Sequence, residues 1–209
     1  MNDCYVELGL TNPCVSLLSE KDDPWIRRRF KIFASIGENR DEVGSMSVMK
    51  LSIGEVCRRR NPLWMVVFDE VSAEASACYE VVFNKKGEIR RPFQDERYGL
   101  CEDLFNDFHF MERIEISEQF KGHGIAGTAT RIYLENFANG EDVAYLKAFS
   151  LQFESRCEDK PYGRLFEGDE RACFAKLCKY YEKIGFRRIG RTNHFFFVVD
   201  DFLGKFARG

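Results

Sequence analysis

A glycine-rich segment at residues 114–127 has the residue types that could bind a phosphate. It reads Ile-Glu-Ile-Ser-Glu-Gln-Phe-Lys-Gly-His-Gly-Ile-Ala-Gly, so an apolar strand leads into a basic turn in which a helix begins. Because Gly122, Gly124 and Gly127 lack a Cβ, the backbone N–H groups between them can approach a ligand oxygen closely. A helix N-terminus adds unpaired N–H donors and a positive dipole end, and Lys121 adds a full charge. The segment indicates a pyrophosphate site, although a plain strand-to-helix turn explains the glycines equally well.

A second segment ends a strongly amphipathic predicted helix and reads Tyr180-Tyr181-Glu182-Lys183-Ile184-Gly185-Phe186. Helical spacing places Tyr181 on the same buried face as Phe174, Leu177 and Cys178, and it turns Tyr180 away by roughly 100°. A tyrosine hydroxyl, with a pKa near ~10, can protonate a leaving thiolate, whose pKa is ~8.5. Tyr181 is therefore a candidate general acid. The alternative is a core tyrosine whose hydroxyl bonds a carbonyl.

Taken in this order, Lys121-Gly122-His123-Gly124-Ile125-Ala126 and Tyr181-Glu182-Lys183-Ile184-Gly185-Phe186 resemble the two signatures of the GNAT superfamily of acetyl-CoA-dependent N-acyltransferases. The family pattern is Arg/Gln-x-x-Gly-x-Gly/Ala at the pyrophosphate loop and Tyr-Glu-Lys-x-Gly-Phe at the later helix, and the resemblance covers roughly residues 108–200. Two residues depart from it. Lys121 replaces the usual Arg or Gln, and Phe174 stands where many members carry an Asn that contacts the cofactor.

The resemblance implies an α/β fold, with a mixed twisted sheet of six or seven strands and helices on both faces. It implies direct transfer of an acetyl group from acetyl-CoA to an amine, with Tyr181 as general acid and without a covalent acyl-enzyme or a metal. The pantetheine arm would lie in a wedge between strands 108–117 and 143–151, bonded by backbone groups near Ile114 and Ile116. The pyrophosphate would be held by Lys121, Gly122, His123, Gly124, Ile125, Ala126 and Gly127.

The general base is the open part of this scheme. Simple alternation along strand 108–117 gives one face the residues Phe110, Glu112, Ile114 and Ile116. A carboxylate among apolar neighbours either lines a cleft or has its charge paired. The resemblance implies that Glu112 removes the amine proton, directly or through water, and an ion pair with an arginine of a neighbouring strand is equally open. Glu115 is the reserve candidate, and the side chain of His123 is expected to face solvent.

The remaining elements follow from periodicity and punctuation. We expect an irregular N-terminal extension at 1–24, then a single domain at 25–209. The predicted elements are strands 26–36 and 43–52, a helix at 55–60, a helix from Trp64 to Val82, a loop at 88–103, strand 108–117, helix 124–138, strand 143–151, helix 170–184 with Asp169 as N-cap and Gly185 as C-cap, and strand 194–199. Residues 152–169 form a charged insertion that we expect to border the acceptor site.

Composition sets the wider limits. The chain has 209 residues, of which 44% are hydrophobic and 14% aromatic, which excludes a disordered protein. Its longest apolar runs are too short to span a membrane, and no signal peptide is expected. Eight cysteines without a Cys-x-x-Cys pair and three histidines give no metal-site spacing and favour free thiols in the cytoplasm. A net charge of −3 disfavours nucleic acid, and the arginine clusters at 27–29, 58–60 and 90–91 are expected to be solvated charge.

Two other functions stay open. A non-catalytic module could keep this fold for binding, and an acetyltransferase could act on a macromolecule such as a protein amine or an aminoacyl-tRNA. The intact glycine loop and Tyr181 argue against the first, and only the arginine clusters hint at the second. The amine acceptor is not identified by these residues, and a homodimer is left open.

Overall fold

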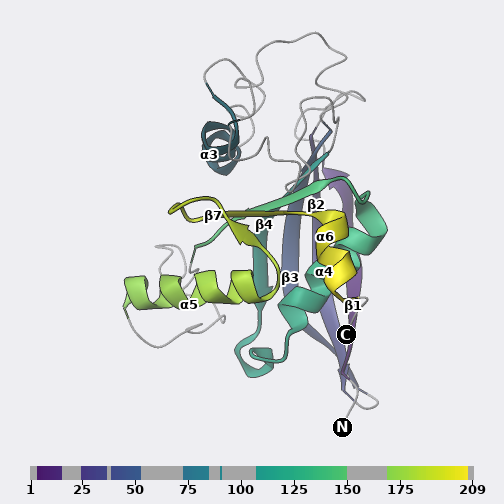
Figure 1. The fold of residues 1–209 in the computed structure, drawn as a ribbon. Helices are drawn as coiled ribbons and strands as arrows, with labels where there is room; N and C mark the ends of the chain where they lie inside the picture. Colours follow the sequence, from purple (N-terminus) through teal and green to yellow (C-terminus); the bar gives the residue numbers. More distant parts are fainter. Residues whose placement is uncertain are drawn as a thin grey trace.

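A seven-stranded sheet forms the centre of the molecule (Figure 1). The computed structural model describes residues 4–15, 25–36, 39–52, 73–84, 90, 107–149 and 169–206. In spatial order the strands are β1 (Cys4–Val15), β2 (Trp25–Ile36), β3 (Asn39–Leu51), β4 (Phe108–Ile116), β5 (Val143–Lys147), β7 (His194–Val198) and β6 (Arg187–Arg188). Among these strands, β4 and β5 run parallel and every other neighbouring pair is antiparallel. The expected mixed α/β sheet is confirmed.

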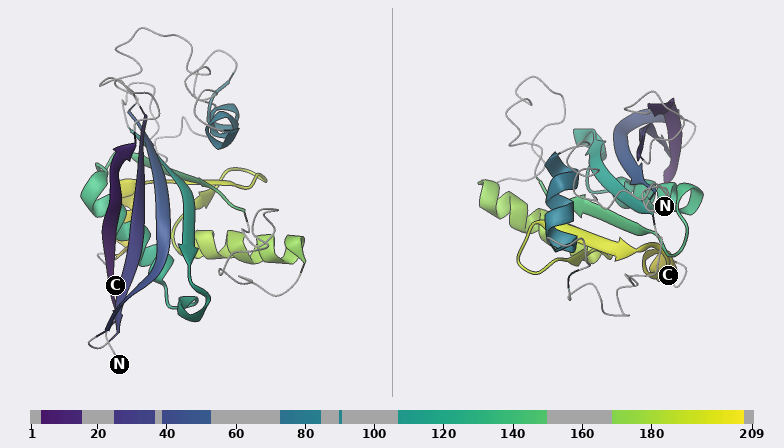
Figure 2. Two further views of the ribbon diagram at one scale, coloured as in Figure 1. Left: turned by 180° about the vertical axis from the view of Figure 1, so that it is seen from behind. Right: turned by 90° about the horizontal axis from the view of Figure 1, so that it is seen from above.

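Helices cover both faces of this sheet. They are α3 (Ala73–Val82), α4 (Ile125–Phe137), α5 (Glu170–Lys183) and α6 (Val199–Phe206), with a short 3-10 helix at Glu118–Phe120. Side chains of α4 and α5 share one buried cluster with the sheet residues Met111, Leu146 and Phe195. We call this side the α4/α5 face. The opposite side is the α3 face, where the Phe83 ring beside α3 lies 6.5 Å from the Phe108 ring. Figure 2 shows α3 and α5 on opposite sides of the sheet.

The N-terminal half of the sheet is built from long antiparallel strands. In β2, burial of Phe30, Ile32 and Ala34 alternates with exposed Arg29 and Lys31, as expected for a strand with one face on the core. The predicted hairpin of strands 26–36 and 43–52 is confirmed as β2 and β3. The prediction that residues 1–24 are irregular is wrong for Cys4–Val15, which pair with β2 as the edge strand. The Asn12-Pro13 pair suggested a break, but it falls where the register shifts.

A β-bulge in β4 changes which residues share a face. Ser47 lies opposite Arg113 and Val48 lies opposite Met111, so these two residues of β3 face three residues of β4. Met111 and Ile114 therefore point to the α4/α5 face together, and Phe110 points to the α3 face. The predicted shared face of Phe110, Glu112, Ile114 and Ile116 is wrong, because the extra residue reverses the alternation.

The C-terminal half contains the helices predicted from periodicity. Helices 124–138 and 170–184 are confirmed as α4 and α5, and Asp169 caps α5 by accepting a 2.8 Å bond from the Ala172 N–H. Strand β5 ends at Lys147, earlier than the predicted strand 143–151. The sequence did not predict β6 or α6. Strand β6 has two residues, too few for a readable period, and α6 has eight residues that follow directly on the apolar strand β7.

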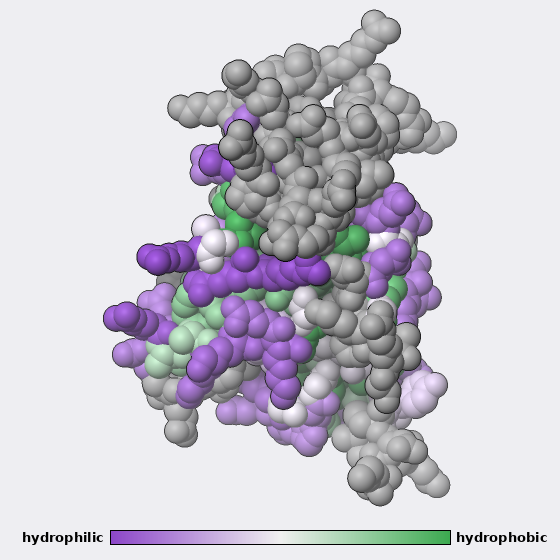
Figure 3. Space-filling model, in the orientation of Figure 1, coloured by the Kyte–Doolittle hydropathy of each residue, from purple (hydrophilic) through white to green (hydrophobic). Residues whose placement is uncertain are grey.

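Several predicted segments lie outside the described residues. They are helix 55–60, the first half of the helix from Trp64 to Val82, the loop at 88–103 apart from Arg90, and the insertion at 152–169 apart from Asp169. The second half of the Trp64–Val82 helix is confirmed as α3. In the described part of the chain, no helix is both long and apolar enough to cross a membrane. Hydrophilic side chains cover most of the described surface in the view of Figure 3.

Candidate functional site

The glycine loop turns the chain from β4 into α4 with two residues in the left-handed region. Gly122 has φ 83° and Gly124 has φ 75°, and open space surrounds the position of a Cβ at both. Gly124 is the N-cap of α4, and the first helical bond runs from the Thr128 N–H to its carbonyl at 3.1 Å. A glycine cap has no side chain to bond the first-turn donors, so the N–H groups of Ile125 and Ala126 stand in the turn that an anion would approach.

The second motif contacts this loop directly. The Tyr180 hydroxyl on α5 accepts a hydrogen bond from the backbone N–H of Gly127, and the Ile184 side chain lies beside the same glycine. Burial raises the pKa of Tyr180, and the Gly127 bond opposes this in part. Helical phase predicted that Tyr180 is turned away from the core. Instead its ring is partly buried, because the end of α5 also packs against α4.

Tyr181 lies on the α4/α5 face between the end of α5 and the sheet. Its ring is 5.7 Å from both the Phe186 ring and the Phe195 ring. Burial raises the pKa of Tyr181, and the neighbouring Tyr180 and Cys178 raise it further. No described residue forms a hydrogen bond with its hydroxyl. The alternative, a core tyrosine whose hydroxyl bonds a carbonyl, is therefore not seen among the described residues.

A gap opens between β4 and β5 next to these tyrosines. The two strands pair at Phe108–Val143, His109–Ala144 and Phe110–Tyr145, and there the ladder ends. Strand β4 continues past Phe110 to Ile116 and then into the glycine loop, bonded on its other edge to β3. Ile114 and Ile116 pack against the same cluster as Tyr181. Beyond Phe110 the edge of β4 that faces β5 is therefore not paired with it, and this unpaired stretch is what we call the gap.

Glu112 lies at the bulge with its charge paired. Its two carboxylate oxygens accept bonds from Arg27 Nη2 at 2.7 Å and Nε at 2.9 Å, and one also accepts from Ser47 Oγ at 2.8 Å. Arg27 belongs to β2, so the pair reaches across β3. The ion pair offered as the alternative for Glu112 is present. Accepting a proton would break the bidentate pair, which makes Glu112 a poor base in this arrangement.

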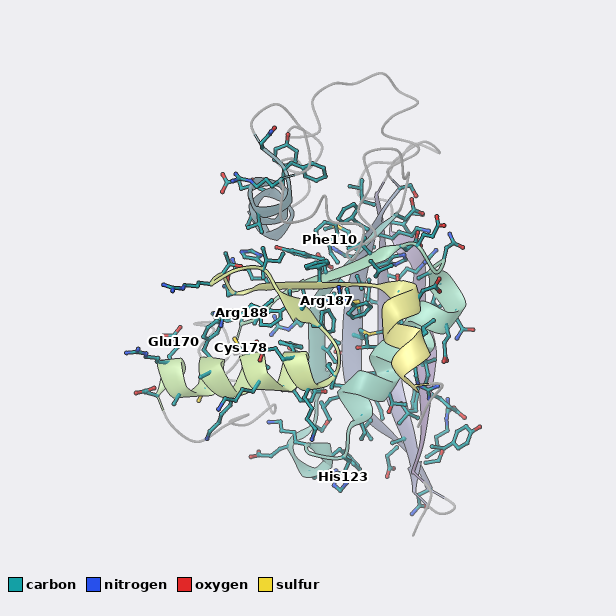
Figure 4. The ribbon with its side chains drawn as sticks, in the orientation of Figure 1. Phe110, His123, Glu170, Cys178, Arg187 and Arg188 are labelled. Carbon is teal, nitrogen blue, oxygen red and sulfur yellow. The ribbon has the colours of Figure 1, made fainter. Side chains whose placement is uncertain are left out.

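The remaining candidate residues lie on both faces of the sheet and in the glycine loop. Glu115 is buried on the α3 face and is hydrogen-bonded by Arg113 Nε. His123 is exposed in the loop (Figure 4), and Lys121 is partly buried. Cys178 points from α5 towards the sheet. The structure therefore brings the loop, Tyr181, Ile114 and Ile116 to one face and places Glu112 near the other.

Sequence reasoning missed a buried polar network under α4. His109 is fully buried, and its ring nitrogens bond Tyr133 Oη at 2.9 Å and Asp142 Oδ2 at 3.0 Å. Asp142 also accepts the N–H groups of Asn139 at 2.8 Å and Asp107 at 3.1 Å. Burial raises the pKa of Tyr133 to about 12. The only sequence signal was a histidine inside an apolar strand, which a satisfied core histidine also explains.

No cluster of three or more His, Cys, Asp or Glu side chains that could hold a metal ion is found among the described residues. The arginines of 27–29 divide between the faces as strand geometry requires. Arg27 pairs with Glu112, and the Arg28 guanidinium lies 4.8 Å from the Phe137 ring of α4.

Comparison with known proteins gives little beyond the geometry. No protein-family model matches the chain, and no curated protein matches it either. Among solved structures, the chain is similar to one in the crystal structure of a KacTA–DNA complex, with a TM-score of 0.45 and 10% sequence identity. The match covers 99% of this chain and 100% of that chain. A likeness this weak assigns neither a family nor an activity.

Proposed function

We propose that the protein is an N-acetyltransferase that moves an acetyl group directly from acetyl-CoA to an amine. The observation that carries the proposal is the contact between the two motifs. The glycine loop and the Tyr-Glu-Lys-Ile-Gly-Phe segment are more than fifty residues apart in sequence, yet Tyr180 bonds Gly127 beside the gap between β4 and β5. A phosphate cradle, a strand edge and a tyrosine hydroxyl at one place suit a long cofactor with a pyrophosphate, amides and a thioester.

Each part of the cofactor would meet a suitable group. The pyrophosphate would bind the first turn of α4, where the helix dipole, two N–H groups and Lys121 favour negative charge. The amides of the pantetheine arm would bond the edge of β4 from Glu112 to Ile116, beyond the last pair with β5. The gap then directs the thioester towards the middle of the sheet.

Tyr181 would protonate the departing sulfur. Its raised pKa keeps the hydroxyl protonated at neutral pH, as a general acid requires. A higher pKa also makes it a weaker acid, so transfer to sulfur depends on the developing negative charge of the thiolate. The hydroxyl is available for this role because no described residue bonds it.

Calorimetry with acetyl-CoA and a thiol-release assay test the proposal together. We expect binding of acetyl-CoA and release of thiol in the presence of a panel containing ethylamine, spermidine and peptides with free amines. Binding without release from any member of the panel would support the non-catalytic module. Absence of both binding and release would overturn the proposal.

A further inference from the structure

A tyrosine and a histidine bond each other on the face opposite Tyr181. Tyr145 Oη of β5 is hydrogen-bonded to Nδ1 of His194 on β7, and their rings stack with centroids 5.7 Å apart. Both side chains are buried, with 2% of Tyr145 and 7% of His194 exposed. No described residue bonds the other ring nitrogen of His194. The transfer described above uses neither residue.

The pair stands where the gap between β4 and β5 begins. Tyr145 is opposite Phe110 in the last pair that joins these strands, and the two rings are 5.3 Å apart on the α3 face. Tyr181 contacts Phe195, which follows His194 in β7 and therefore points to the α4/α5 face. A thioester in the gap would have Tyr181 on one side of the sheet and Tyr145 on the other.

We propose that Tyr145 and His194 together take up the proton that a positively charged acceptor amine must lose. The inference rests on the proposed acetyl transfer. It also gives the acceptor a chemical class: amines that are ammonium ions at neutral pH.

The proton count explains why such a pair is needed. An ammonium acceptor loses two protons as its C–N bond forms and the C–S bond breaks, with the C–S electron pair going to sulfur. One proton passes to Tyr145 Oη while the hydroxyl proton of Tyr145 moves to His194 Nδ1, which becomes an imidazolium. Tyr181 protonates the thiolate, and the second proton of the amine then returns Tyr181 to its neutral hydroxyl form. An amine that is already neutral loses one proton only, which replaces the one given to sulfur, and it needs no further base.

The surroundings of His194 favour an uncharged imidazole. Burial lowers the pKa of His194, and Lys147, opposite it on β5, lowers it further. Register also places Arg187 of β6 on this face, opposite Phe196. The two carboxylates of β4, Glu112 and Glu115, are bonded by arginines and do not offset these cations at the imidazole. The ring is therefore uncharged at pH 7, and its lowered pKa also makes it a weaker base, so proton uptake depends on the positive charge that the amine loses.

The test uses two amines that differ in charge. Ethylamine is an ammonium ion at pH 7, and aminoacetonitrile is mostly neutral. For Tyr145→Phe and for His194→Gln we expect kcat/KM with ethylamine to fall about 10²-fold and with aminoacetonitrile less than about tenfold. Acetyl-CoA affinity should be unchanged. Tyr133→Phe is the matched control, because it removes a buried hydroxyl that bonds a histidine on the other face.

The pH profile separates proton transfer from packing. With ethylamine, kcat/KM of the wild type should rise with pH while the imidazole loses its proton and should then stay constant. The constant range should begin at about pH 6.5 or lower, because the imidazole is neutral there. In both variants it should rise about tenfold per pH unit to alkaline pH, because only the free-amine fraction reacts. If the variants lose the same factor of kcat/KM with both amines, or keep the wild-type pH profile, the inference is overturned. The proposed function still stands in that case, provided that the wild type turns over. A wild type that releases thiol with neither amine overturns both.

Discussion

The hydroxyl of Tyr180 and the backbone N–H of Gly127 join the end of α5 to the first turn of α4. This bond uses one of the few N–H groups that the start of α4 leaves unpaired, so a pyrophosphate would depend on the neighbouring Ile125 and Ala126 donors. Adjacent tyrosines consequently have different tasks. Tyr180 holds the loop against α5, and Tyr181 faces the sheet with its hydroxyl available.

Tyr180→Phe should act on stability more than on turnover. The ring keeps its packing, but the Gly127 N–H loses its partner, so the free energy of unfolding should fall by about 0.5–1.5 kcal/mol. Because the proposed proton donor, Tyr181, is intact, kcat should change less than about threefold. Urea unfolding and steady-state kinetics check this. A loss of kcat as large as that of the Tyr181 variant would contradict the division of roles.

Tyr181→Phe should act on turnover more than on stability. Under the proposed function this change removes only the proton donor to sulfur, so kcat should fall by roughly 10²–10⁴-fold with little change in acetyl-CoA affinity. The free energy of unfolding should change little, since no described residue bonds the hydroxyl. Single-turnover thiol release measured beside calorimetry separates these effects. An unchanged kcat would remove Tyr181 from the mechanism.

Gly124→Glu should abolish acetyl-CoA binding by placing a carboxylate at the positive end of α4. Gly124 is exposed with open space around its Cβ position, so the fold should survive with only the cost of a left-handed residue. Gly190→Glu is the matched control, because Gly190 is also exposed, has φ 56° and lies in the turn before β7. Calorimetry should show binding in the control only. Equal binding in both variants would disprove the phosphate site.

Glu112→Gln should lower the free energy of unfolding by about 1–3 kcal/mol, because the Arg27 guanidinium loses a bidentate charged partner with limited exposure. Turnover should fall less than tenfold. The control is Glu42→Gln, whose partner Lys31 is 2.6 Å away but half exposed, and it should cost less than ~1 kcal/mol. Chemical unfolding measures the loss of stability of each variant, and steady-state kinetics measure its kcat/KM. A 10²-fold loss of kcat/KM at unchanged stability would make Glu112 the base instead.

Regular periodicity predicted most of the described fold. Helices α4 and α5 and strands β2, β3 and β4 follow from apolar spacing, and Asp169 was found as a cap because its side chain acts within one turn. Strand β1 was missed because its identity comes from pairing with β2, and its own sequence contains the turn-like Asn12-Pro13. Tertiary pairing decided what local preference could not.

The candidate site was predictable only in part, for a related reason. The loop and Tyr181 stand out as local motifs, and the structure brings Tyr180 and Ile184, on either side of Tyr181 in sequence, against Gly127 of the loop. The bulge in β4 leaves no mark in the sequence, so a strict period of two assigned Glu112 to the wrong neighbours. The Tyr145–His194 and His109–Asp142 pairs join residues that are distant in sequence, and only the assembled sheet brings them together.

The buried network around Asp142 should make stability depend on acid pH. Burial alone would raise the pKa of Asp142, but the bonds from His109 and from two backbone N–H groups outweigh it, and the pKa is lowered. A carboxyl group with a lowered pKa stabilises the fold above its unfolded pKa of about 3.9 and loses this contribution as pH falls through the folded value. Wild-type unfolding free energy should therefore decline steeply below about pH 4.

Asp142→Asn should remove that part of the pH dependence. At pH 7 the variant should be less stable than the wild type by about 1–3 kcal/mol, because a charged acceptor of several buried bonds is lost. The difference should shrink as pH falls through the acid range, where the wild-type carboxyl is itself protonated. Urea unfolding at a series of pH values measures it, with exposed Glu141→Gln as the neighbouring control. A difference that stays constant down to the most acid pH would show that Asp142 stabilises the fold by shape and not by its charge.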